Sequence, residues 1–374
     1  MDIRDVTAPA ERITMQLCAL YAQYGYRKFK LRKFEEYDFY AEYRSFLQTE
    51  NILIFHDLSG KLMALKPDVT LSIVKNIRDD SPAPQRVYYN ENVYRASGGV
   101  RAFKEMPQVG LEYIGAVDLY AMGEVLQMAA RSLKLIAADY ILDISHVGLA
   151  SGLLGETGLP EHALSGLSAC IRAKNVHGML ELCGSYGVEK ALQQKLVRLC
   201  SLYGACGEVL PALPELDVNA ATHAAIAELT AVCEVLRLAG CAGNVRLDFS
   251  MLNDLSYYNG VIFQGFLPGI PSAVLSGGRY DSLLERLHKR GGAIGFAVYI
   301  GLLERVEEAP APYDVDTLLL YDETVPLSAL LEAVNTLTEG GRSISVQSAQ
   351  DGGLRPAQTL RITKEGGVCR AGLA

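Results

Sequence analysis

The amino-acid sequence predicts an α+β protein: an antiparallel sheet flanked by helices, with a helical insertion and a small C-terminal α/β domain. Two observations lead to this fold class. Strand-like segments come in hairpin-like pairs before residue 118 and return after residue 240. The residues between them are rich in Ala and Leu, as helices are. Strands followed by helices and then by strands favour an α+β core with an insertion.

The N-terminal elements follow from periodicity and stop signals. A helix is predicted over Pro9–Tyr24, where Ile13, Leu17 and Leu20 recur at helical spacing and Gly25 follows as a C-terminal stop. The next segments are predicted, in order, as a hairpin of strands at 51–57 and 61–65, a helix at 71–78, and strands at 85–94 and 106–115.

The C-terminal half gives the domain boundaries. The stretch Glu307–Pro312 contains two prolines and two glutamates and is typical of a linker. We therefore expect a domain over 1–309, with its helical insertion at about 145–240, and a second domain over 313–374. The remaining segments are predicted as strands at 244–247, 259–266 and 273–275, a helix at 280–288, an apolar segment at 293–303, and then strand 317–321, helix 326–337 and strands 343–346 and 359–363.

Composition excludes several classes of protein. The net charge is -8, which disfavours nucleic acid as a partner because acidic surfaces repel phosphates. No apolar run is long enough to span a membrane and the first residues lack a signal-peptide pattern, so we expect a cytoplasmic protein with no membrane contact. None of the eight cysteines forms a C-x-x-C pair, so we expect reduced core cysteines and no metal site.

Three stretches place polar residues inside strand patterns. Asp68 and Thr70 follow an apolar strand, either as the cap of a helix or as part of a site. Gln108 and Glu112 point to one side of a strand, because residues two apart share a face; they form either a pocket floor or a solvated sheet face. The tandem tyrosines Tyr257 and Tyr258 precede Ser276-Gly-Gly-Arg-Tyr-Asp281, where glycines allow a backbone to approach a ligand closely.

Together these stretches resemble the histidyl-tRNA synthetase family of class II synthetases, across residues 5–305. Five segments match in the family's order: Lys66–Thr70, the strand–loop–strand of motif 2 from Arg86 to Glu112, Leu255–Phe263, Ser276–Asp281, and the opening of motif 3 at Gly295–Ala297. The resemblance implies a class II synthetase-like sheet. It also implies a set of histidine-binding residues: Asp68, Thr70, Arg95, Gln108, Glu112, Tyr257 and Tyr258.

Within that set, the resemblance assigns Asp68, Thr70 and Gln108 to the α-ammonium group of histidine. It assigns Glu112 and Tyr258 to the imidazole, which a carboxylate and a phenol together can satisfy at both ring nitrogens. A buried site of this kind rejects amino acids that leave its polar atoms unpaired.

The groups that handle ATP in the synthetases are absent at the matching positions. The adenine-reading glutamate of motif 2 is Ser97, the histidine-specific arginine is Asn253, and the motif 3 arginine falls on Leu302, with Arg305 on another side of the helix. Loss of one donor to a transition-state charge costs about 2.7–4 kcal/mol, so we expect no catalytic residue and no adenylation.

This pattern resembles the synthetase-like regulatory subunits of ATP phosphoribosyltransferase in histidine biosynthesis. The resemblance implies a non-catalytic protein without a cofactor, which binds L-histidine and mediates activation and feedback inhibition of a catalytic subunit in a hetero-oligomer. It also implies a homodimeric core, although motif 1 departs from the family at Lys33 and Glu35. The C-terminal 62 residues carry five Lys or Arg against eight acids, a poor surface for tRNA. The alternatives are a divergent histidyl-tRNA synthetase and a free-standing histidine sensor.

Overall fold

A computed structural model of the protein describes residues 7–47, 51–77, 83–96, 102–252, 257–303, 313–349 and 352–371. The chain divides into two compact units. The larger unit is Ile13–Val306, and the smaller one contains the strands that follow residue 312.

The larger unit is built on a nine-stranded sheet in the order β1-β5-β6-β12-β11-β10-β7-β9-β8. Neighbouring strands from β5 to β7 are antiparallel, whereas β1 pairs parallel with β5 and β9 pairs parallel with β7. The strands are β1 (Arg27–Lys28), β5 (Gln85–Ala96), β6 (Phe103–Gly115), β7 (Ile141–His146), β8 (Tyr203–Ala205), β9 (Val245–Asp248), β10 (Val261–Phe266), β11 (Leu275–Arg279) and β12 (Gly292–Tyr299).

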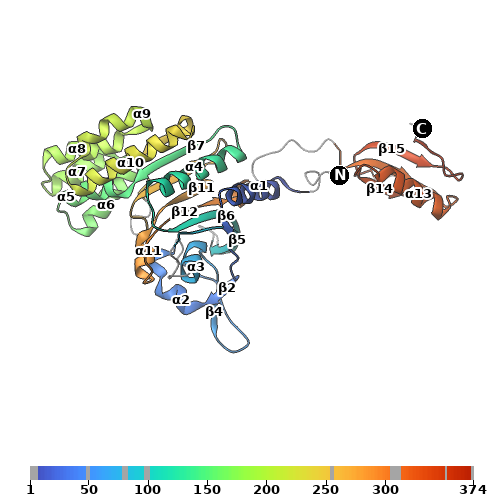
Figure 1. The fold of residues 1–374 in the computed structure, drawn as a ribbon, viewed down its shortest axis with the longest axis horizontal. Coiled ribbons are helices and arrows are strands. Elements are labelled where there is room, and N and C mark those ends of the chain that lie inside the picture. Colours follow the sequence, from blue (N-terminus) through green and yellow to red (C-terminus); the bar gives the residue numbers. More distant parts are fainter. Residues whose placement is uncertain are drawn as a thin grey trace. The chain divides into compact units, whose positions relative to one another are not determined.

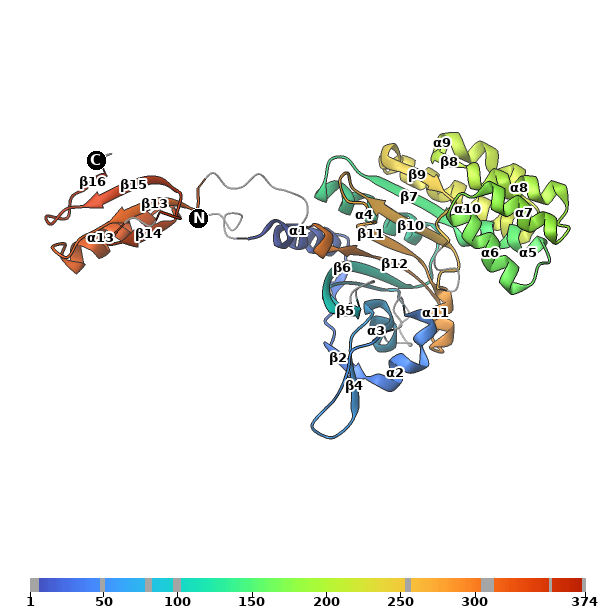
Figure 2. The same ribbon diagram turned by 180° about the vertical axis from the view of Figure 1, so that it is seen from behind.

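Helices cover one face of this sheet. The helices α1 (Pro9–Gln23) and α4 (Leu119–Ile136) lie against it, as Figures 1 and 2 show. Tyr21 of α1 is fully buried: its ring packs edge-on against Phe296 of β12, and its hydroxyl lies 2.9 Å from Ser132 Oγ of α4. The aromatic and aliphatic residues of α1 thus join the helix layer to the centre of the sheet.

The opposite face of the sheet carries a small subdomain. A three-stranded sheet in the order β2-β4-β3 and the helix α3 (Val69–Asn76) lie there (Figure 1). The other elements of the subdomain are β2 (Phe34–Glu36), α2 (Tyr37–Glu42), η2 (Arg44–Phe46), β3 (Ile54–His56) and β4 (Leu62–Leu65). Its buried side chains, among them Tyr40 and Ile73, form one core with Tyr89 of β5 and Tyr280. This core holds the start of α3 above the sheet.

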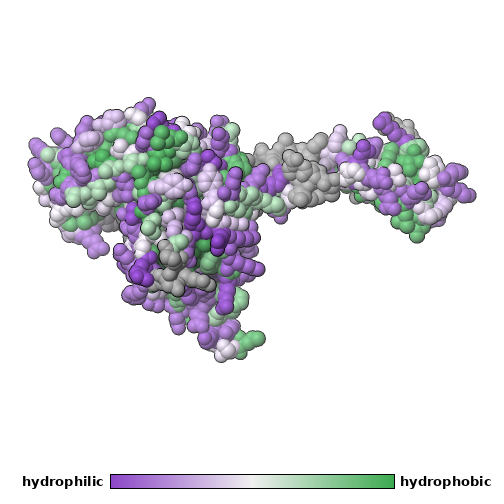
Figure 3. Space-filling view, viewed as in Figure 1, coloured by the Kyte–Doolittle hydropathy of each residue, from purple (hydrophilic) through white to green (hydrophobic). Residues whose placement is uncertain are grey.

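The helical insertion lies between β7 and β9. Its main helix α10 (Ala220–Leu238) begins with a capping box made by Asn219 and Thr222 and packs on α4 and α5. The other elements are α5 (Val147–Glu156), α6 (Glu161–Arg172), α7 (Val176–Ser185), α8 (Lys190–Ser201), α9 (Cys206–Val209), η3 (Leu210–Leu216) and η4 (Ala242–Asn244). In Figure 3, hydrophilic residues dominate the visible surface, and hydrophobic ones gather over the insertion.

The larger unit ends with α11 (Asp281–Arg286) and α12 (Ile300–Leu303). The smaller unit is a four-stranded sheet in the order β14-β13-β15-β16, with α13 packed on it through Leu319, Ala333 and Ile362. Its elements are β13 (Val315–Leu320), α13 (Leu327–Thr338), β14 (Ile344–Gln347), β15 (Pro356–Ile362) and β16 (Val368–Arg370).

The structure and its relatives confirm the predicted fold class, and several details of the prediction are wrong. The strands β7 and β8 lie in a region predicted as helical. Apolar and polar residues alternate in β7 only over Leu142–Ser145, a pattern too short to stand out from the helices on either side. The strand β11 extends through Gly277 and Gly278, which were expected to follow the strand rather than belong to it. The strand β16 was not predicted. In the described part of the chain, no helix is long and apolar enough to cross a membrane.

Candidate functional site

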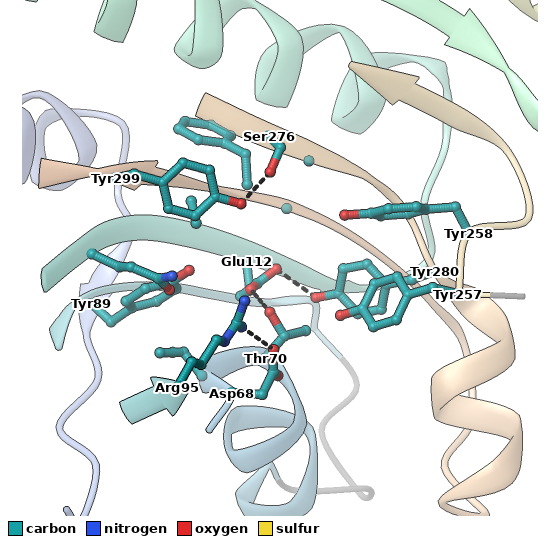
Figure 4. Close-up of a pocket in the computed structure, with 16 residues that line it drawn as sticks. Asp68, Thr70, Tyr89, Arg95, Glu112, Tyr257, Tyr258, Ser276, Tyr280 and Tyr299 are labelled. Atoms are coloured by element: carbon teal, nitrogen blue, oxygen red, sulfur yellow. Dashed lines mark hydrogen bonds and ion pairs between the residues drawn. The ribbon is translucent and has the colours of Figure 1, made fainter. Parts of the chain in front are cut away.

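A pocket lies between the sheet and the start of α3, and its empty space of about 420 Å³ includes part of the open solvent. All seven residues that the sequence predicted as a site line it: Asp68, Thr70, Arg95, Gln108, Glu112, Tyr257 and Tyr258. Figure 4 labels all of these except Gln108 and shows them converging from the start of α3, the strands β5 and β6, and the segment before β10. Residues separated by nearly 200 positions in sequence therefore share one small cavity.

Asp68 serves both as a helix cap and as a wall of the pocket. Its Oδ1 accepts a hydrogen bond of 2.8 Å from Leu71 N, and this hydrogen bond caps the first turn of α3. Its Oδ2 lies 3.4 Å from Arg95 Nη2, and Arg95 Nε donates to the Pro67 carbonyl over 2.8 Å. Burial raises the pKa of Asp68, and the nearby Arg95 guanidinium opposes that rise. The helix-cap interpretation of Asp68 is therefore confirmed, and the same carboxylate also lines the pocket.

Gln108 and Glu112 lie on the pocket floor. Their side chains are 3% and 1% exposed, so the solvated-face interpretation is wrong. The Glu112 carboxylate is held at both oxygens: Thr70 Oγ1 donates to Oε1 over 2.7 Å, and Tyr280 OH donates to Oε2 over 2.5 Å. The carboxylate is thus fixed in orientation within the cavity (Figure 4).

Burial makes Glu112 a weak acid. Its pKa is raised to about 8: removal from water is the main cause, the hydrogen bonds from Tyr280 and Thr70 oppose the rise, and the nearby charge of Asp68 adds to it. A carboxyl group in such an environment gains from a ligand that brings a hydrogen-bond donor or a positive charge.

Two glycines in adjacent strands make room for these side chains. A Cβ on Gly295 of β12 would lie 1.7 Å from Glu112 Oε2, in the place that the carboxylate occupies. A Cβ on Gly278 of β11 would lie 2.7 Å from the Tyr258 ring. The sheet therefore accepts a glutamate and a tyrosine above it only because the facing positions carry no side chain.

The tandem tyrosines have different surroundings. Tyr257 is buried and belongs to the core cluster, with its ring 5.8 Å from the ring of Tyr280. Tyr258 is half-buried, and its hydroxyl end points into the cavity opposite Glu112 (Figure 4). Tyr258 is thus placed to meet a ligand, whereas Tyr257 mainly supports the wall.

Sequence reasoning missed four lining residues with polar side chains: Tyr89, Ser276, Tyr280 and Tyr299. Tyr280 and Ser276 lie within the Ser276–Asp281 segment that the sequence singled out, so the motif carried a signal for them. Tyr299 and Ser276 are hydrogen-bonded through their hydroxyls on the side of the pocket away from α3 (Figure 4). Tyr89 is fully buried, and nothing in the sequence distinguished it from the other tyrosines of its strand.

The positions that mark the missing ATP apparatus are only partly described. Leu302 lies in α12 and is half-buried, whereas Ser97, Asn253 and Arg305 lie outside the described residues. The motif 1 departure at Glu35 has a physical account: its buried carboxylate accepts a 2.5 Å hydrogen bond from Lys75 Nζ of α3. An ion pair thus holds the Glu35 carboxylate against α3. Lys33 contributes its backbone carbonyl, which accepts a hydrogen bond from Lys66 N.

All eight cysteines carry free thiols. Only Cys183, Cys200 and Cys233 are buried and Cys369 is exposed, so the expectation of core cysteines is wrong for most of them. Within the described residues, no group of three or more His, Cys, Asp or Glu could hold a metal ion.

Comparison with known proteins places this architecture in a family. Residues 4–303 match the model of the histidyl-tRNA synthetase family. The ATP phosphoribosyltransferase regulatory subunit of Acetivibrio thermocellus is 29% identical over 335 residues, covering 86% of this chain and 79% of that protein.

Two solved structures share the fold. A Bacillus halodurans protein, described as an ATP phosphoribosyltransferase regulatory subunit/histidyl-tRNA synthetase, has a TM-score of 0.78 at 27% identity, covering 92% of this chain and 90% of that one. A chain of the ATP phosphoribosyl transferase (HisG:HisZ) complex from Thermotoga maritima has a TM-score of 0.62 at 18% identity, covering 78% and 97%. This chain therefore belongs to the histidyl-tRNA synthetase-like family of ATP phosphoribosyltransferase regulatory subunits.

Proposed function

We propose that this non-catalytic subunit binds L-histidine in the pocket above Glu112 and uses it to control a separate catalytic subunit of ATP phosphoribosyltransferase. Free of histidine it activates that subunit, and with histidine bound it mediates feedback inhibition. The observation that carries the proposal is the buried Glu112 carboxylate, held by Thr70 and Tyr280 and facing Tyr258 across the pocket.

The imidazole ring suits the two groups that face each other. A ring N–H donates to the Glu112 carboxylate, and the other nitrogen pairs with the Tyr258 hydroxyl, which can donate or accept. Both ring nitrogens are then satisfied away from water, and a side chain that lacks them leaves Glu112 with a buried acceptor unpaired. A ligand that leaves such a group unpaired binds far more weakly, because the group has lost its hydrogen bonds to water and gains none in return.

The α-ammonium and α-carboxylate groups suit the other end of the pocket. Asp68, Thr70 and Gln108 offer oxygen acceptors to the ammonium, and Arg95 offers a guanidinium to the carboxylate. Asp68 and Glu112 favour a ligand that brings an ammonium group and a ring able to share a proton with a carboxyl group.

The partner follows from the family. Relatives are named regulatory subunits, and the Thermotoga maritima structure is described as a HisG:HisZ complex. A protein that retains a synthetase-like fold but has lost the cations for ATP acts by contact with another chain. By linkage, histidine must then bind the inhibited assembly more tightly than the active one, by about 1–3 kcal/mol in typical allosteric couplings.

Reconstitution with a catalytic subunit of ATP phosphoribosyltransferase tests the proposal. We expect the mixture to elute as a hetero-oligomer in gel filtration, to form phosphoribosyl-ATP faster than the catalytic subunit alone, and to lose that activity as histidine is added. Two independent species with an unchanged rate would contradict the assignment and favour a free-standing sensor.

A second measurement addresses the alternative of an active synthetase. Histidine-dependent pyrophosphate exchange by the isolated protein should stay at the blank level at saturating histidine and ATP, because Asn253 and Leu302 stand where the synthetases carry arginine. Exchange clearly above the blank would establish adenylation and sink the proposal of a non-catalytic subunit.

A further inference from the structure

Two cysteines of the helical insertion lie in direct contact. Cys206 is the first residue of α9, Cys233 lies on α10, and their Sγ atoms are 3.0 Å apart although 27 positions separate them in sequence. Both are free thiols. A disulfide requires an S–S separation of about 2.05 Å, so bond formation needs the two sulfurs to approach by about 1 Å.

The two thiols differ in reactivity. Cys233 Sγ donates the hydrogen bond and Cys206 Sγ accepts it, which lowers the pKa of Cys206 against the opposing effect of burial. The same hydrogen bond, together with burial, raises the pKa of Cys233. Cys206 is half-buried, whereas Cys233 is only 4% exposed. Cys206 therefore meets the requirements of an attacking thiolate, and Cys233 those of a protected resolving thiol.

We propose that Cys206 and Cys233 form a modification site, which a small-molecule disulfide of the glutathione type oxidises reversibly to an intramolecular disulfide. The Cys206 thiolate attacks one sulfur of glutathione disulfide, forming a mixed disulfide and releasing one glutathione thiolate. Cys233 then gives up its proton and attacks the Cys206 sulfur, and the second glutathione leaves as a thiolate that takes up that proton. Two protein thiols are oxidised, and one glutathione disulfide becomes two glutathione thiols.

The proposed bond would tie the start of α9 to the helix that connects the insertion to the sheet. On α10, five positions before Cys233, Glu228 contacts His146 of β7 over 3.0 Å and Arg279 of β11 over 3.4 Å. Arg279 directly precedes Tyr280, which holds Glu112. The disulfide would therefore restrain the helix that contacts β11, the strand that ends directly before Tyr280.

The test exposes the full-length reduced protein to glutathione disulfide, quenches it with acid and alkylates the remaining thiols after denaturation. Cleavage after glutamate separates Cys233, in 229–234, from Cys206, in 190–208. Mass spectrometry should find these two fragments joined by a disulfide, and dithiothreitol should separate them. The oxidised protein should also melt a few degrees higher, because the bond restricts the unfolded chain.

Variants assign the roles of the two sulfurs. Cys233→Ser should stop at a stable glutathione adduct on 190–208, because the resolving thiol is gone. Cys206→Ser should yield no joined fragments. Because Cys200 lies in the same fragment, 190–208, this result also excludes Cys200 as the disulfide partner of Cys233. Cys241→Ser is the matched control, since Cys241 is half-buried and its Sγ lies 3.6 Å from the Ala239 carbonyl rather than against another thiol; it should oxidise like the wild type.

Two results would overturn the proposal. One is a wild-type protein that keeps a glutathione adduct on 190–208 without joined fragments. The other is that Cys206 and Cys233 are both still fully alkylated under conditions in which glutathione disulfide has already modified the exposed Cys369. The readout is a mass and does not involve histidine, so it stands or falls separately from the proposed function.

Discussion

Tyr280 donates a 2.5 Å hydrogen bond to Oε2 of Glu112, from a position 168 residues further along the chain. Both side chains are buried, and Thr70 occupies the other carboxylate oxygen. This relationship decides how the pocket responds to substitution and to pH, because it orients a carboxyl group that water cannot reach.

Replacement of Glu112 by Gln should weaken histidine binding by roughly 10- to 150-fold, since a hydrogen bond to a charged group contributes about 1.5–3 kcal/mol. The shape of the pocket is retained, so the variant should still assemble and activate the catalytic subunit while resisting inhibition by histidine. Titration calorimetry and the histidine dependence of activity measure both effects. Glu105→Gln is the control, because Glu105 lies exposed on the same strand; equal midpoints for the two variants would mean that the pocket is misplaced.

Replacement of Gly295 by Ala should abolish measurable histidine binding. The added Cβ would lie 1.7 Å from Glu112 Oε2 and 2.5 Å from the Leu111 carbonyl, so the carboxylate or the β6–β12 pairing must shift. Strain of this kind typically costs about 1–3 kcal/mol of stability, measurable by urea unfolding. Gly301→Ala is the matched control, because its Cβ would make only ordinary contact with Pro107 at 3.5 Å. Unchanged binding by Gly295→Ala would contradict the geometry.

Histidine affinity should peak between about pH 6.5 and pH 8. In that window Glu112 is protonated in the free protein, with a pKa of about 8, and the free imidazole is neutral, with a pKa of about 6.5. A complex that shares one proton between ring and carboxylate then forms without net proton exchange. Above pH 8 formation of the complex requires the uptake of a proton, and below pH 6.5 it requires the release of one. Histidine affinity therefore falls on both sides of this window. Calorimetry in several buffers checks this; the fall that begins near pH 8 should be missing in Glu112→Gln.

The stability of the ligand-free protein should fall with pH through the same group. Burial raises the pKa of Glu112 from about 4.5 to about 8, so between these values the folded state binds more protons than the unfolded state. The free energy of unfolding then decreases by up to about 1.4 kcal/mol per pH unit. This contribution is fully present below pH 4.5 and is lost as the pH rises through 8. Relative to the wild type, Glu112→Gln should therefore gain stability from pH 5 to pH 8 in denaturant melts; a constant difference would show that Glu112 is ionised throughout.

Much of this protein followed from its sequence. The order of the segments predicted the fold class, and strand alternation placed Gln108 and Glu112 on one face, because side chains two apart in a strand share a side. The motifs brought Asp68, Arg95 and the tandem tyrosines into one set before any geometry was known. Asp68 caps α3 as predicted and also lines the pocket, since a helix cap needs one carboxylate oxygen and leaves the second for Arg95.

Tertiary structure alone decided the rest. The strand β7 alternates over only four residues, and its neighbours β10 and β9 come from more than 90 residues away, so its place in the sheet depends on packing. The burial of Glu112, and with it the raised pKa, depends on Tyr280 and on the missing side chain at Gly295, which no local pattern connects to β6. The contact between Cys206 and Cys233 likewise requires α9 and α10 to meet. Local sequence specifies elements and faces, whereas burial and the distance between remote side chains arise only when the elements pack together.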